Sequence, residues 1–165
     1  KGTAEIKNYI SLKQTKPKIA ENQGYLIPKK SVFNKIIGDN AFELEVAGLL
    51  ENRFADVTAY AKNTFGEGGV NFKIEYQAEN GNIKEYFPDF FIKTTPNTFF
   101  ILETKGREDL DDIKKIKRLI TWCQDTNKAQ NKYTYTPVYV KQEKWEEVKK
   151  DLKTFKNLLK IFEAK

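Results

Sequence analysis

Histidine and methionine are absent from this sequence of 165 residues, and cysteine occurs once, as Cys123. Without histidine, these residues cannot form a Ser-His-Asp or Cys-His catalytic site, a histidine general base or a histidine-ligated zinc site. A single cysteine cannot form an internal disulfide and is typical of a reducing compartment. The phosphate-binding pattern G-x-x-x-x-G-K-[ST] is also missing, which excludes a nucleotide-driven motor of that type within these residues.

Long apolar runs are missing as well. The longest uninterrupted run is too short for a transmembrane helix, and the N-terminal residues do not read as a secretory signal peptide. We therefore expect a cytoplasmic protein with no membrane contact. Because the sequence starts at Lys1 and contains no methionine, we also expect it to be a fragment or processed piece of something larger.

Charge is unevenly distributed along the chain, although the net charge is +6. Residues 1–40 carry 8 lysines and arginines against 3 acidic residues, and residues 106–165 carry 15 against 10. Residues 41–105 carry only 6 against 10. An acidic middle between two basic flanks suits a site that holds a divalent cation on a polyanion. A lysine-rich surface with no such role explains the composition equally well.

The residue pattern predicts an irregular basic lead-in over residues 1–30, which would link the domain to a missing upstream region, followed by one α/β domain over residues 31–165. Alternating apolar residues predict strands, and apolar residues at helical spacing predict helices. The expected order is a helix starting near Asn40, strands over 70–77, 83–93 and 98–106, a helix over 108–124, a strand over 133–141 and a helix from about Gln142. The Pro137 in the last strand favours a sheet edge.

Two acidic residues lie in otherwise hydrophobic strands, where a carboxylate is costly unless it is paired or binds a metal. Asp89 follows Pro88, and Glu103 precedes Lys105 by two positions, so Glu103 and Lys105 share a strand face. If the two strands form a hairpin, the carboxylates of Asp89 and Glu103 approach each other closely. Two carboxylates with backbone and water oxygens suit Mg²⁺ or Mn²⁺, and a neighbouring lysine stabilises developing negative charge. Such a site hydrolyses phosphodiesters without histidine.

Ordinary structural roles compete with this interpretation. An acidic residue after proline is often a turn cap, and Glu-x-Lys on a strand is often a solvated ion pair. Glu43 is a third site candidate because it points into the apolar arc of its helix, whereas Glu45 points to the far side. A capping-box role beside Asn40 explains Glu43 equally well, and both roles can hold.

These residues resemble the PD-(D/E)xK nuclease superfamily, with Pro88-Asp89 and Glu103-Thr104-Lys105 as its signature. Several blocks in order resemble, more narrowly, the C-terminal endonuclease domain in the Res subunit of type III restriction enzymes. They are KSVFNKIIGDNAFELEVA, DVTAYAKN, YFPDFFIK, ILETKGRED, RLITWCQD and YVKQEKWEE. The similarity runs from about Tyr25 to Trp145. It implies a restriction-endonuclease-like fold, in which helices flank a central mixed β-sheet.

The resemblance also implies a role for each matching residue. Asp89 and Glu103 would coordinate Mg²⁺, with Mn²⁺ as a substitute and the Thr104 carbonyl as a further ligand. Lys105 would position the attacking water, and Glu43 would support the metal site. Double-stranded DNA would be the substrate, and the protein would be prokaryotic.

An upstream ATP-dependent helicase-like motor and a DNA-methyltransferase modification subunit would complete the intact complex, so ATP would act only through a region outside these residues. Cutting both strands needs two active sites, which favours a dimer of nuclease domains. Three basic residues near the motif are candidates for DNA phosphate contacts, namely Arg107, Lys62 and Lys93. Two alternatives stay open: a non-catalytic DNA-binding or assembly module with a nuclease fold, and another nuclease of the superfamily, such as a resolvase or repair enzyme.

Overall fold

In the computed structural model of this chain, which describes residues 4–6 and 9–165, four strands form a mixed central sheet flanked by helices. In sheet order they are β3 (Ala59–Lys62), β6 (Phe90–Thr95), β7 (Thr98–Lys105) and β8 (Thr134–Lys141). The pairs β3–β6 and β6–β7 are antiparallel, and β7–β8 is parallel. The expected mixed α/β fold class is confirmed, and β8 lies at an edge of the sheet, as Pro137 suggested.

Connections between strands follow from these directions. A tight turn joins the antiparallel strands β6 and β7, whereas the parallel pair β7–β8 requires a crossover, which α2 (Asp112–Ala129) provides. Helix α2 begins four residues later than residue 108, where the sequence pattern placed its start. Of the described residues, none forms a helix long and apolar enough to cross a membrane.

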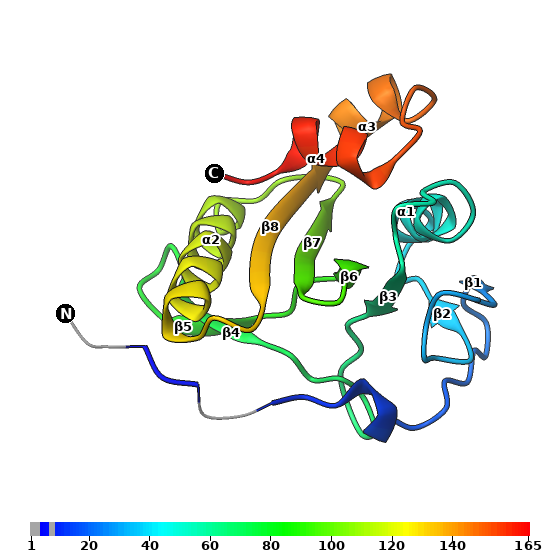
Figure 1. The fold of residues 1–165 in the computed structure, drawn as a ribbon. Coiled ribbons are helices and arrows are strands. Elements are labelled where there is room, and N and C mark those ends of the chain that lie inside the picture. The colour runs from blue at the N-terminus through cyan, green and yellow to red at the C-terminus, as the bar shows by residue number, and fades with distance from the viewer. Residues whose placement is uncertain (1–3, 7–8) are drawn as a thin grey trace.

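Helices cover both faces of the sheet (Figure 1), and an apolar cluster lies on each face. On one face, α2 packs against β8 and against the hairpin of β4 (Ile74–Gln77) and β5 (Ile83–Tyr86). The opposite face packs against α1 (Ala41–Asn52), α3 (Gln142–Val148) and α4 (Phe155–Phe162). Alternation along β7 divides its side chains between the faces: Ile101 belongs to the first cluster, and Phe100 and Leu102 belong to the second.

The N-terminal part contains the 3₁₀ turn η1 (Leu12–Gln14) and two short strands, β1 (Tyr25–Leu26) and β2 (Ile36–Ile37), which pair with each other. Strand β1 lies inside the expected lead-in, so the pairing crosses residue 31. Residues 1–3 and 7–8 of that lead-in lie outside the described residues.

Two elements that the sequence pattern predicted as continuous are each divided in two in the structure. The expected strand over 83–93 is divided into β5 and β6, which belong to different sheets. Pro88 lies between them, and because it has no amide hydrogen it cannot continue a strand ladder. The expected C-terminal helix is likewise divided into α3 and α4, because Thr154 caps a new helix with its side chain.

Candidate active site

Asp89 and Glu103 lie at the same end of the β6–β7 hairpin. Phe90 pairs with Leu102 at the end of the antiparallel ladder, and Asp89 and Glu103 each lie one residue beyond this pair. The prediction that these two strands pair as a hairpin is therefore confirmed. The negative charge of Asp89 is close enough to raise the pKa of Glu103. Two carboxylates that are distant in sequence are neighbours here.

The carboxylate of Asp89 is held by Thr104. Both the backbone amide and the side-chain hydroxyl of Thr104 donate hydrogen bonds to Oδ2 of Asp89, at 2.7 Å and 2.6 Å. Strand β6 starts only at Phe90, so the Asp89 side chain takes the place of a strand partner for this amide. Thr104 was expected to contribute its carbonyl oxygen to a metal. In the structure the amide and hydroxyl of Thr104 bind Asp89. The role of the Thr104 carbonyl oxygen as a metal ligand stays a prediction.

Lys62, at the end of β3, is a buried cation surrounded by three carboxylates. Its Nζ lies 3.0 Å from Glu43 Oε2, 3.1 Å from Asp39 Oδ2 and 3.6 Å from Asp89 Oδ1. Only 4% of the Lys62 side chain and 6% of the Glu43 side chain are exposed. Burial opposes the charge on Lys62, but Asp89, Glu43 and Asp39 outweigh it and raise the lysine pKa. Lys62 is therefore a permanent internal cation beside Asp89.

Glu43 lies at the start of α1 and also belongs to this cluster. The Asn40 side chain accepts a hydrogen bond from the Glu43 amide, which is one half of the expected capping box, but the Glu43 carboxylate accepts from the Asp39 amide at 3.0 Å and not from the Asn40 amide. The prediction that Glu43 faces the apolar side of α1 is confirmed, because it is buried with Phe42 and Val46. Burial raises the pKa of Glu43 and the charge of Asp89 raises it further, while Lys62 opposes the shift.

Glu103 is the least satisfied group of the site. Its Oε2 is buried and forms no hydrogen bond of good geometry among the residues that the structure describes, although the buried Tyr86 hydroxyl lies beside it. Burial raises the pKa of Glu103 well above its usual range, and the negative charge of Asp89 adds to the shift. Tyr86, Lys105 and Lys115 oppose it. A buried acceptor without a partner is costly and calls for a ligand or a proton.

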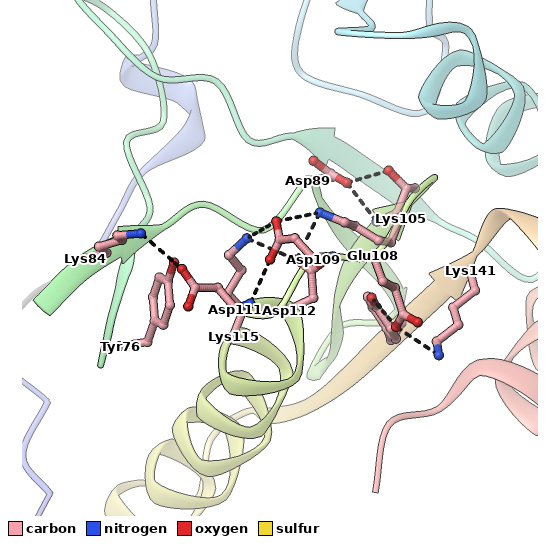
Figure 2. Close-up of polar contacts among 12 residues, drawn as sticks. Tyr76, Lys84, Asp89, Lys105, Glu108, Asp109, Asp111, Asp112, Lys115 and Lys141 are labelled. Carbon is pink, nitrogen blue, oxygen red and sulfur yellow. Dashed lines mark hydrogen bonds and ion pairs between the residues drawn. The ribbon is translucent and has the colours of Figure 1, made fainter. Parts of the chain in front are cut away.

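Lys105 leaves β7 on the same strand face as Glu103 and ends at the start of α2. Its Nζ lies 2.9 Å from Asp112 Oδ1 and 3.6 Å from Asp109 Oδ2. Figure 2 shows Lys105 beside these two carboxylates. The side chain is 20% exposed. The structure thus brings Lys105 to the edge of the site, where acidic residues from α2 and its preceding loop already engage it.

The three residues expected to contact DNA differ in their exposure and in their distance from the site. Arg107 is exposed just after β7, next to the site. Lys93 is half-buried over the Phe99 ring, and four residues of strand separate it from Asp89, about 13 Å. Lys62 is buried among carboxylates rather than exposed, so the expectation that it touches a phosphate does not fit its surroundings.

Sequence reasoning missed several residues that shape the site. Strand β3 went unrecognised because AYAK is short and its apolar residues are mostly small, and with it the internal role of Lys62 was missed. Asp39, Tyr86, Asp112 and Lys115 were also missed. The only available signal was local: Asp112 and Lys115 are three residues apart at the start of an expected helix, which is a common surface pair.

The described residues contain no group of three His, Cys, Asp or Glu side chains placed to hold a metal ion. Two carboxylates with an unsatisfied buried oxygen are nevertheless hard oxygen donors of the kind that Mg²⁺ binds. No protein-family model matches the sequence, and neither a curated protein nor a solved structure is significantly similar to this chain. Any function must therefore be argued from the site itself.

Proposed function

We propose that this chain is a metal-dependent DNA endonuclease domain with a restriction-endonuclease-like fold. The observation that carries the proposal is that Asp89 and Glu103 lie at one end of the hairpin, with a buried oxygen on Glu103 that has no well-placed partner among the described residues. That donor set fits a hard divalent cation, which would replace the missing partner of Glu103. Asp89, Glu103 and the carbonyl of Thr104 would hold the cation.

Surplus negative charge around the site supports the same proposal. Three carboxylates surround the single positive charge of Lys62, namely Asp39, Glu43 and Asp89. Glu103 lies nearby and has a raised pKa. Asp89 raises the pKa values of Glu43 and Glu103, and a divalent cation would relieve this repulsion. When bound, Mg²⁺ would activate water and neutralise phosphate charge.

Each residue of the chain then has a definite task. Thr104 and Lys62 hold the Asp89 carboxylate in place, and Glu43 anchors Lys62. The ammonium group of Lys105 would donate hydrogen bonds to a phosphate oxygen or to the attacking water, which stabilises charge that develops in the transition state. The basic flanks of the chain would attract the DNA backbone through long-range electrostatics.

The sequence blocks quoted above favour a type III restriction complex as the setting. In that setting the motor, its ATP hydrolysis and the methyltransferase subunit would lie outside these residues. Cleavage of both DNA strands would require two copies of the site, so activity would depend on nuclease-domain pairing or on the motor.

A non-catalytic DNA-binding module is the second candidate. It is favoured by the ion pairs and hydrogen bonds that already engage Asp89 and Lys105, since a decayed site can be stabilised by such internal contacts. The two candidates differ in one respect: only the nuclease needs the cation. DNA binding by the module would be insensitive to Mg²⁺, and no condition would give cleavage.

Cleavage of a supercoiled plasmid separates the two candidates. The parent chain is expected to nick the plasmid with Mg²⁺ or Mn²⁺ and not with EDTA. Asp89→Asn and Lys105→Ala are expected to remove this activity while keeping the fold, as followed by circular dichroism. Glu75→Gln, an exposed glutamate on β4, is the matched control and should cut like the parent. Cleavage by both site variants at the parental rate would refute the assignment.

A further inference from the structure

Asp112, in the first turn of α2, holds two lysines on one oxygen atom. Its Oδ1 lies 2.9 Å from Lys105 Nζ and 3.0 Å from Lys115 Nζ, and its Oδ2 accepts a hydrogen bond from the Asp109 amide at 2.6 Å. The Asp112 side chain is only 3% exposed. In Figure 2 the two lysines reach Asp112 from different elements, Lys105 from β7 and Lys115 from α2.

This arrangement exceeds what helix stability requires. A pair such as Asp112 and Lys115, three residues apart on a helix, contributes little to helix stability when it is exposed. Here the carboxylate is buried, and Lys105 is brought to it from another element. Two ammonium groups on one oxygen repel each other, so the surroundings must hold them there. Burial opposes the charged form of Asp112, but the Asp109 amide and the two lysines lower its pKa.

Lys105 lies two residues after Glu103 on β7 and therefore shares its strand face, and Asp112 Oδ1 holds Lys115 beside Lys105. Each lysine side chain is 20% exposed, so neither is fully enclosed by the protein. A phosphate bound beside Glu103 would therefore meet two cations and not one.

We propose that Lys115 is a second phosphate-contacting lysine of this site, and that Asp112 is the positioning residue that holds Lys105 and Lys115 side by side. The inference rests on the proposed nuclease function. The ligand is the scissile phosphodiester group of DNA, whose pentavalent transition state carries more negative charge than the ground state. A lysine ammonium is a compact point charge, and two of them in fixed positions stabilise that charge without reorganisation.

Single-turnover cleavage of plasmid DNA in Mg²⁺ tests the proposal on four variants. Lys115→Ala is expected to lower the cleavage rate by about 10–1,000-fold, with DNA affinity within about threefold of the parent. Lys115→Arg keeps the charge and should recover most of the rate. Asp112→Asn should lower the rate as well, because it loosens both lysines. Lys117→Ala, on the exposed side of the same helix, is the matched control.

Calorimetric measurement of Mn²⁺ binding and of the melting temperature separates a role of Lys115 in cleavage from a role in folding or in metal binding. Lys115→Ala is expected to bind Mn²⁺ and to melt like the parent, whereas Asp89→Asn loses Mn²⁺ binding. Parental cleavage by Lys115→Ala, beside an inactive Asp89→Asn, would overturn the inference and leave the nuclease function standing. Equal losses in Lys115→Ala and Lys115→Arg with lower melting temperatures would overturn it too, by showing a structural role. A parent that neither binds Mn²⁺ nor cuts DNA would refute the function first and the inference with it.

Discussion

Replacing Glu103 with glutamine is expected to stabilise the metal-free protein, although the residue belongs to the proposed active site. Oε2 of the Glu103 carboxylate is buried and lacks a hydrogen-bond partner of good geometry among the described residues, and Glu103 lies near Asp89. An unpaired buried polar group costs about 1–3 kcal/mol, and a charged one costs more. Glutamine keeps the shape and removes the charge. We therefore expect Glu103→Gln to raise the free energy of unfolding by about 1–3 kcal/mol at neutral pH, or roughly 3–9 °C in Tm.

The stabilisation should depend on pH with a definite sign. The pKa of Glu103 is raised in the folded protein. Below the pKa that Glu103 has in the unfolded chain, the carboxyl group is neutral in both states and does not lower the free energy of unfolding. As pH rises from there through the folded-state pKa, the parent loses stability. The difference between Glu103→Gln and the parent should therefore be small near pH 4, about the ordinary glutamate pKa, and grow towards neutral pH.

Thermal melts across this pH range, with and without Mg²⁺, measure both effects. Mg²⁺ at about a hundred times its Kd should stabilise the parent by about 2.7 kcal/mol. It should have little effect on Glu103→Gln. The control Glu75→Gln should match the parent in every condition, since Glu75 is exposed. A variant that is destabilised without metal, or a difference that does not grow with pH, would show that Glu103 is not the unsatisfied group described above.

Three further predictions follow from the Lys62 ion pairs, the burial of Cys123 and the proposed pairing of active sites. Lys62→Met should cost about 3–5 kcal/mol in urea unfolding, because it leaves Glu43 and Asp89 without their buried counter-ion; a loss under about 1 kcal/mol would contradict this. Burial raises the pKa of Cys123 to about 12, so a thiol-specific reagent should label it at neutral pH only after unfolding, and rapid labelling of the native protein would count against the packing. Covalent tethering of two copies should raise the ratio of double-strand breaks to nicks, and an unchanged ratio would argue against paired active sites.

Local rules predicted the parts of the fold that depend on local pattern. The start of α1 at Asn40, the β4–β5 hairpin and the β6–β7 hairpin each carry a capping or turn signal in the sequence, and each is present. The two breaks were missed for different reasons. Apolar residues lie on both sides of Pro88, so the pattern did not indicate that β5 and β6 belong to different sheets. No glycine or proline marks the end of α3, and the carboxylate of Asp56, distant in sequence, accepts amides at the start of α4.

The site was predictable only where its members share a hairpin. Asp89 and Glu103 could be paired from strand alternation and one turn. Lys62 could not, because a lysine is ordinarily exposed, and its burial depends on Glu43 and Asp39 arriving from another element. The link between Lys105 and Asp112 likewise depends on where α2 packs, which the periodicity of neither element determines.

Calorimetric titration of Mn²⁺ or Mg²⁺ into the parent and Asp89→Asn, with plasmid cleavage followed in the same samples, tests most directly whether Asp89 and Glu103 hold a catalytic cation. The account predicts saturable binding and metal-dependent cutting by the parent, with both lost in Asp89→Asn. Equal metal binding by the two proteins, or cutting that persists in the variant, would contradict it.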